Sequence, residues 1–137
     1  MIGIVCADKN NGLFFNNRRQ SSDKMIVRDI LLMSSAKKVY MTEYSFKLFD
    51  KNEFNIPTDN LYIYDDISKV AGDVYCFLER ENLLTEMFSK LIVYRWDRIY
   101  PADAVLDLEK WNMISQLEFQ GYSHEKIRKE VYVKDAK

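Results

Sequence analysis

Short apolar runs and amphipathic segments alternate along most of the chain. Residues 1–7 form a nearly continuous apolar run, which is typical of a strand buried on both faces. Further apolar runs bounded by turn residues predict strands at 37–42, 61–64, 74–78 and 91–96. Apolar residues at helical spacing predict helices at 21–34, 44–49 and 79–90, with a helical turn at 65–70. Two last strands, at 111–120 and 129–134, are expected to form an antiparallel hairpin.

This order of elements predicts an α/β fold. Helices that connect strands favour parallel pairing, so we expect a three-layer arrangement with a mostly parallel central sheet, flanking helices and an antiparallel C-terminal hairpin. Residues 13–20 show no period and are predicted to be a surface loop. The chain contains no repeat, low-complexity tract or linker, so residues 1–137 are expected to form a single domain.

Composition and charge narrow the class of protein. Of the 137 residues, 47% are hydrophobic, which is enough for a core and excludes a disordered chain. The net charge of −1 gives no overall attraction for nucleic acid or anionic membranes, although local patches stay open. No apolar run approaches the roughly 20 residues of a membrane span, and no basic segment precedes the N-terminal apolar run. We therefore expect a cytoplasmic protein in which Cys6 and Cys76 are buried, reduced thiols.

Several short motifs follow one another in a recognisable order. They are Ile-Gly-Ile-Val-Cys-Ala-Asp-Lys-Asn-Asn-Gly at 2–12, Lys-Val-Tyr-Met at 38–41, Asn-Leu-Tyr-Ile at 60–63, Leu-Ile-Val-Tyr-Arg-Trp-Asp at 91–97, Pro-Ala-Asp-Ala at 101–104, Trp111, and Lys-Glu-Val-Tyr-Val-Lys at 129–134. In this order they resemble the strands and loops of dihydrofolate reductase. The resemblance covers nearly the whole chain and implies a dihydrofolate-reductase-like domain over 1–137. That family transfers hydride from NADPH to a pterin.

The proton donor that the resemblance implies has one candidate. The family places a carboxyl group at the start of the helix after the long loop, and here this position is Asp23. A buried carboxyl with a raised pKa could donate a proton to the pterin. An Asp after two serines is also a common helix N-cap, which is the interpretation we favour. The tryptophan that precedes this acid in the family is missing, because residues 18–20 are Arg-Arg-Gln.

The ligand-binding positions of the family are largely replaced. Glu43 lies where a glycine and a basic residue would meet phosphate at a helix N-terminus. Phe77 and Leu78 end the strand where a glycine pair would let the cofactor approach. The stretch 64–74 is too short for the family's extra strand and helix. Tyr94 replaces the threonine beside the pterin, and the arginine that pairs with folate falls at 58 or 59, where this chain has Thr and Asp. We therefore expect no cofactor, with NADPH only if reductase activity survives.

Other candidate chemistry is sparse. His124 is the sole histidine and lies in a polar segment, so we predict a surface histidine without a triad or metal site. Arginines interleave with aromatics at 94–100, which suggests a patch for nucleic acid or another ligand formed by Arg18, Arg19, Arg95 and Arg98. The alternative is that the aromatics of this stretch pack in the core and Arg95 and Arg98 are ordinary solvated charges.

The leading hypothesis is a binding or assembly module without reductase activity on a dihydrofolate-reductase-like scaffold. Its partner is an unidentified protein or a second copy. The alternatives are a divergent NADPH-dependent dihydrofolate reductase that uses Asp23, and a small nucleic-acid-binding protein. The compact size and altered active site suit an accessory protein of a virus or mobile element, which would place it in the host cytoplasm.

Overall fold

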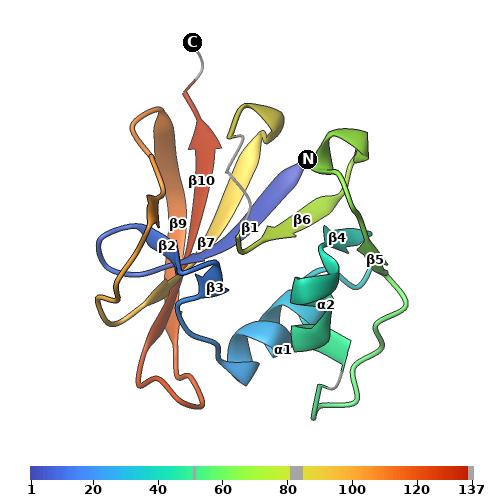
Figure 1. Cartoon of the computed structure of the whole chain (residues 1–137), viewed down its shortest axis with the longest axis horizontal. Helices are drawn as coiled ribbons and strands as arrows, with labels where there is room; N and C mark the ends of the chain where they lie inside the picture. The colour runs from blue at the N-terminus through green and yellow to red at the C-terminus, as the bar shows by residue number, and fades with distance from the viewer. Residues whose placement is uncertain (51, 81–84, 136–137) are drawn as a thin grey trace.

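A seven-stranded sheet forms the centre of the computed structural model, which describes residues 1–50, 52–80 and 85–135 (Figure 1). The strand order is β5-β4-β6-β1-β7-β10-β9. The bounds are β1 Ile2–Ala7, β4 Val39–Met41, β5 Leu61–Ile63, β6 Tyr75–Leu78, β7 Lys90–Trp96, β9 Trp111–Phe119 and β10 Ile127–Lys134.

Five neighbouring strands run parallel and the last two antiparallel. Strand β1 pairs in parallel with β6 and β7, and β4 pairs in parallel with β5 and β6. Strand β10 pairs antiparallel with both β7 and β9. The predicted α/β class, with a mostly parallel sheet and a C-terminal hairpin, is confirmed. Parallel strands bring their carboxyl ends to one edge, so the segments that follow β1, β4, β6 and β7 meet there.

Both helices cover one face of the sheet. Helix α1 (Lys24–Met33) buries Ile26, Val27, Ile30 and Leu31, and α2 (Glu43–Asp50) buries Phe49 in the same apolar cluster. Asp23 caps α1 by accepting a hydrogen bond from the backbone N–H of Met25, as its place after two serines predicts. None of the helices in the described ranges is long and apolar enough to cross a membrane.

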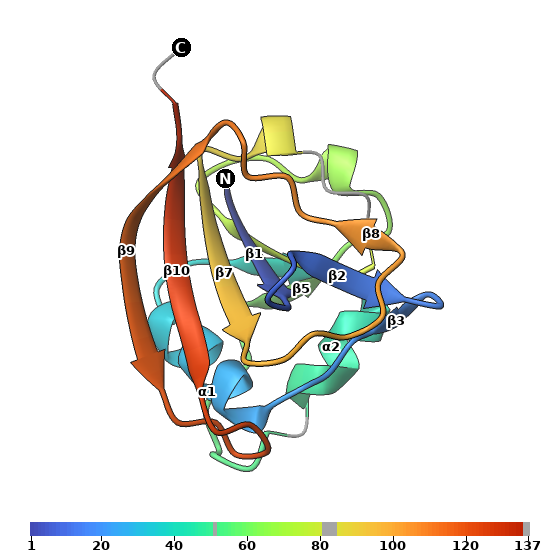
Figure 2. The ribbon, with the colours of Figure 1, turned by 90° about the vertical axis from the view of Figure 1, so that its left-hand side faces the viewer.

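The opposite face is covered by a small second sheet with the strand order β3-β2-β8, together with short 3-10 turns (Figure 2). Its strands are β2 (Gly12–Phe15), β3 (Arg18–Arg19) and β8 (Ala104–Val105), so the predicted loop at 13–20 is wrong. Asn16 and Asn17 both have positive φ (51° and 58°) and form a two-residue hairpin turn between β2 and β3. A pair of asparagines is one of the few non-glycine sequences that tolerate this turn.

The helix predicted at 79–90 is also corrected. The chain bends at 79–80, residues 85–87 (Thr85–Met87) form a single 3-10 turn, η2, and Lys90 already begins β7. The remainder of the predicted helix, 81–84, lies outside the described residues. Another 3-10 turn, η1 (Ile67–Lys69), confirms the helical turn expected after Asp65.

Candidate functional site

Asp23 is the most heavily hydrogen-bonded carboxylate at the carboxyl edge of the sheet. It is 4% exposed, and besides capping α1 it accepts hydrogen bonds from the backbone N–H groups of Tyr122 (2.9 Å) and Ser123 (2.9 Å). Burial alone would raise its pKa, but these hydrogen bonds and one from His124 outweigh burial and lower the pKa to about 2. This direction is opposite to the one that a proton donor to a pterin requires, and it supports the capping interpretation.

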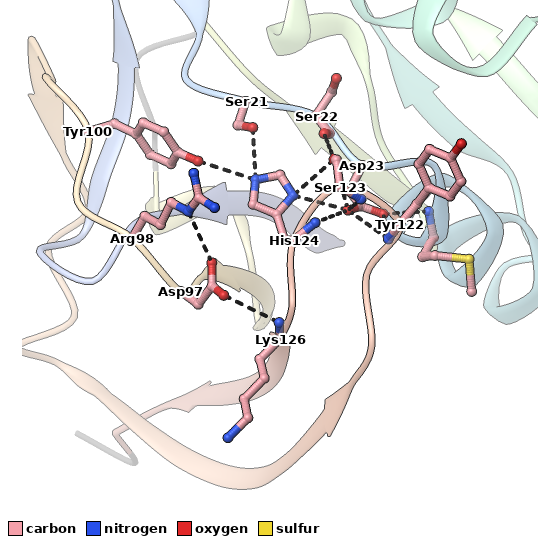
Figure 3. Close-up of polar contacts among 11 residues, drawn as sticks. Ser21, Ser22, Asp23, Asp97, Arg98, Tyr100, Tyr122, Ser123, His124 and Lys126 are labelled. Carbon is pink, nitrogen blue, oxygen red and sulfur yellow. Dashed lines mark hydrogen bonds and ion pairs between the residues drawn. The ribbon is translucent and has the colours of Figure 1, made fainter.

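His124 is buried beside Asp23, not exposed as the sequence indicates. Its ring stacks on Trp96 with 4.5 Å between ring centroids, and its Nδ1 lies 3.0 Å from the Asp23 carboxylate. Its Nε2 lies 3.0 Å from the Ser21 hydroxyl and 3.2 Å from the Tyr100 hydroxyl (Figure 3). The predicted surface position of this histidine is therefore wrong. These partners lie 24 to 103 residues away along the chain, so the polar local sequence gives no signal of burial.

The space next to this cluster is nearly closed. A cavity of about 10 Å³ is lined by Asp23, Cys6, Phe49, Phe77 and Trp96, which leaves room for about one water molecule. Burial strongly raises the pKa of the Cys6 thiol, so this thiol stays protonated and unreactive at neutral pH.

A half-buried ion pair closes the middle of the same edge. Arg19 meets Glu79 through two hydrogen bonds of 2.6 and 2.8 Å, and Ser45 donates a third to the same carboxylate (2.8 Å). Arg19 also lies over the ring of Tyr44, 4.4 Å from its centroid. These groups connect β3, α2 and the end of β6. They lie between Asp23 and the start of α2.

The edge near α2 is open by contrast. A cavity of about 720 Å³ is lined by residues of α2 and of the segments after β4, β5 and β6, including Glu43, Lys47, Asp65 and Arg80. Glu43 occupies the first turn of α2 and is exposed. Phe77 and Leu78 are buried at the end of β6. The opening is large enough for a ligand, but acidic and basic side chains are mixed along its walls.

Comparison with solved structures shows which known fold this chain resembles. No family model matches the sequence, and no curated protein matches it. Dihydrofolate reductase from Enterococcus faecalis, solved in complex with NADP(H) and RAB-propyl, superposes with a TM-score of 0.58 and 9% sequence identity, over 97% of this chain and 95% of that one. The fold is dihydrofolate-reductase-like. At this identity the likeness extends to the fold alone.

In this reductase-like fold, Tyr94 stands where the resemblance places the pterin-linking threonine. Tyr94 is fully buried, and its hydroxyl donates to Asp29 of α1 at 2.5 Å. Burial, followed by the nearby Asp29 charge, raises its pKa far above the usual range, so the hydroxyl remains a donor. The Tyr94 hydroxyl is therefore held by helix α1.

The predicted arginine patch does not form. Arg95 is buried, with its side chain paired to Glu130 at 2.9 Å and bonded to the carbonyl oxygen of Asp8 at 2.7 Å. Arg19 is engaged by Glu79, whereas Arg18 and Arg98 remain exposed. The alternation that places Tyr94 and Trp96 on the helix-covered face turns Arg95 towards the second sheet, where its charge is neutralised. Among the described residues, no group of His, Cys, Asp or Glu could hold a metal ion.

Proposed function

We propose that this chain is a binding or assembly module on a reductase-like scaffold, without reductase activity. The observation that carries the proposal is the filled space beside Asp23, where about 10 Å³ remains. Small-molecule pockets typically enclose about 300–1,000 Å³, so a pterin and a nicotinamide ring do not fit without displacing Phe49, Phe77 or Trp96. The low pKa of Asp23 supports the same conclusion, because an ionised carboxylate cannot protonate a substrate.

NADPH titration followed by tryptophan fluorescence tests this proposal. Trp96 lines the closed cavity, so a nicotinamide that entered would change its emission. We expect no saturable change up to millimolar NADPH, and no oxidation of NADPH when dihydrofolate is added. Saturable binding at micromolar concentration, or turnover of dihydrofolate, would contradict the proposal and favour the divergent reductase. A control titration with free tryptophan corrects for light absorbed by the cofactor.

The edge strand β9 supports the assembly part of the proposal and points to a second copy as the partner. Its nine residues pair only with β10 in the described part of the chain, and Met113, Ile114 and Leu117 are 45–57% exposed. An antiparallel self-pairing centred on Ser115 would place Glu118, the only charged residue of the strand, opposite the neutral Asn112. Long edge strands that expose apolar side chains and carry few charges favour strand pairing between chains.

Light scattering after gel filtration, across a concentration series, tests self-association. We expect a dimer that dissociates on dilution and becomes monomeric in the Leu117→Lys variant. A matched control is Leu32→Lys, since Leu32 is 50% exposed on α1, away from β9. A monomer at every concentration would contradict assembly through this edge. Nucleic acid is not favoured as the partner, because Arg95 and Arg19 are already paired.

A further inference from the structure

From the residues around His124 we infer that this chain carries a serine-nucleophile centre, with Ser21 as nucleophile and His124 as general base, which accepts small carboxylic esters. The inference goes beyond the proposed binding function and does not depend on it. A chain that has lost hydride transfer can still carry out acyl transfer at another group of residues.

The first support is the hydrogen-bond chain from Ser21 to Asp23. The Ser21 hydroxyl lies 3.0 Å from Nε2 of His124, and Nδ1 of the same ring lies 3.0 Å from the Asp23 carboxylate. An ionised carboxylate only accepts, so in the neutral ring the proton sits on Nδ1 and Nε2 is left as an acceptor. The order hydroxyl, imidazole and carboxylate is the arrangement that activates a serine.

The second support is the rigidity of the base. Trp96 stacks on the ring with an interplanar angle of 28°, and backbone N–H groups of Tyr122 and Ser123 fix the carboxylate. Asp23 is a positioning residue here, because it holds the tautomer and orientation of His124 without reaching the reacting atoms. Burial restricts water, which strengthens the interaction between the carboxylate and an imidazolium that forms during attack.

The third support is a candidate donor for the developing oxyanion. The Tyr100 hydroxyl lies 3.2 Å from the same nitrogen that Ser21 approaches (Figure 3). A neutral ring offers one lone pair there, so only one of the two hydroxyls can direct its proton fully at it. When Ser21 occupies that lone pair, the Tyr100 proton is available to the carbonyl oxygen of a substrate, and such donors supply a large share of acyl-transfer catalysis.

The cavities around Ser21 and Tyr100 indicate the size of the acyl group and the chemistry of the alcohol part of the ester. Ser21 borders two cavities of about 10 Å³ each, and each has room for about one water molecule. An acyl group bound at Ser21 must therefore be small, of acetyl size at most, and must displace this water and shift a neighbouring side chain. Tyr100 also borders an open cavity of about 370 Å³, together with Phe15, Arg18 and Gln20. Arg18 is exposed there and forms no ion pair with the residues that the structure describes. The substrate class is therefore an acetyl-sized ester of an alcohol that carries an aromatic or apolar part and an acidic group.

The reaction balances without a cofactor. Ser21 Oγ forms a bond to the carbonyl carbon while its proton passes to His124 Nε2. The ester C–O bond breaks, and the proton moves from Nε2 to the leaving alkoxide. Water then attacks the acyl-serine with proton transfer through the same nitrogen, which releases the carboxylic acid and restores the hydroxyl.

A biotinylated fluorophosphonate tests the nucleophile directly, because a serine activated in this way forms a P–O bond and releases fluoride. We expect one label per chain by intact mass, located at Ser21 by peptide mapping. Protein that is denatured before the probe is added should not be labelled. Ser21→Ala should abolish labelling, whereas Ser22→Ala should retain it, since Ser22 is the exposed neighbour and contributes only its backbone carbonyl to the cluster. Mapping of the wild-type label keeps the test decisive if Ser21→Ala does not fold.

Ester hydrolysis tests the remaining roles. The folded protein should hydrolyse 4-acetoxybenzoate faster than phenyl acetate, and Arg18→Gln should reduce that preference about tenfold through KM alone. Tyr100→Phe should lower kcat about 100-fold while the labelled site remains Ser21. No labelling of the folded wild-type protein, a label at another residue, or equal labelling of Ser21→Ala would overturn the inference. None of these results bears on NADPH binding, so failure here leaves the proposed binding function standing.

Discussion

The two ends of the carboxyl edge of this sheet differ in how much open space they leave. Around Asp23 the space is filled, since aromatic rings and a hydrogen-bonded His124 leave about 10 Å³. Near Glu43 the space remains open at about 720 Å³, and the Glu43 carboxylate lies in the first turn of α2 beside it. The side chains at the filled end are part of the packed core, whereas Glu43 at the open end is an exposed surface charge. Substitutions at the two ends should therefore differ sharply in their cost.

The largest expected effect follows from Asp23→Ala. Removing the carboxylate leaves the N–H groups of Met25, Tyr122 and Ser123, and Nδ1 of His124, without their acceptor in a buried place. Each unsatisfied buried donor costs roughly 1–3 kcal/mol, partly recovered by relaxation, so we expect a loss of about 4 kcal/mol in the free energy of unfolding. Urea denaturation measures it. A loss below about 1 kcal/mol would mean that the cluster adds little to stability.

The next effect is expected from Gly121→Ala, in the turn that Asp23 binds. A Cβ built at Gly121 lies 2.6 Å from the carbonyl oxygen of His124 and 2.7 Å from the Asp23 carboxylate. The backbone oxygen cannot yield easily, so the turn must shift. Overpacking of this kind costs about 1–3 kcal/mol, and we expect the upper end because two fixed polar atoms are involved. Gly72→Ala is the matched comparison, since no atom lies within 4 Å of its added Cβ and its cost comes only from a φ of 102°.

Acid should lower the free energy of unfolding in a definite pH range, because Asp23 becomes protonated there. The folded-state pKa of Asp23 is about 2, below the value of about 3.9 expected in an unfolded chain. Its contribution is therefore complete above about pH 5 and is lost as the pH falls towards 2, with a size of about 2 kcal/mol. Denaturation at several pH values measures this loss, and Asp23→Asn should show a shallower decline by that amount. Parallel declines in the two proteins would contradict the low pKa.

These polar contacts mark the limit of what the sequence predicts. The apolar run at 91–96 and the cap at Asp23 depend on local spacing, so the strand and the helix start were predictable. Burial of His124 depends on Trp96 and Asp23, which are distant in the chain. The polar residues next to it in the sequence predict a surface position instead. Burial of Arg95 is not predictable for the same reason, because its partner Glu130 lies on another strand. Motif order does carry long-range information, and it gave the fold although identity to the solved reductase is 9%.

Three of the replaced positions, Glu43 at the open end and Phe77 and Leu78 at the filled end, were predictable because they are single residues at known places in the motif order. Glu43 and the Phe77–Leu78 pair lie where the resemblance places them, at the start of α2 and the end of β6. The other side chains of the filled end were not predictable from those positions. Phe49, Trp96 and the Arg19–Glu79 ion pair come from four separate elements or turns, and only the folded sheet brings them together.

The smallest effect on stability is expected from Glu43→Lys, which sharpens the comparison at the open end. Glu43 is exposed in the first turn of α2, so charge reversal costs only its interaction with the helix dipole, less than about 1 kcal/mol. A basic residue facing this cavity should raise affinity for inorganic pyrophosphate by up to about tenfold, measured by calorimetry. NADPH should still not bind, because its nicotinamide would have to enter the filled end beside Trp96. Binding of NADPH restored by this single substitution would show that charge alone, and not the packed rings, excludes the cofactor; Glu43→Gln separates removal of the acid from addition of the base.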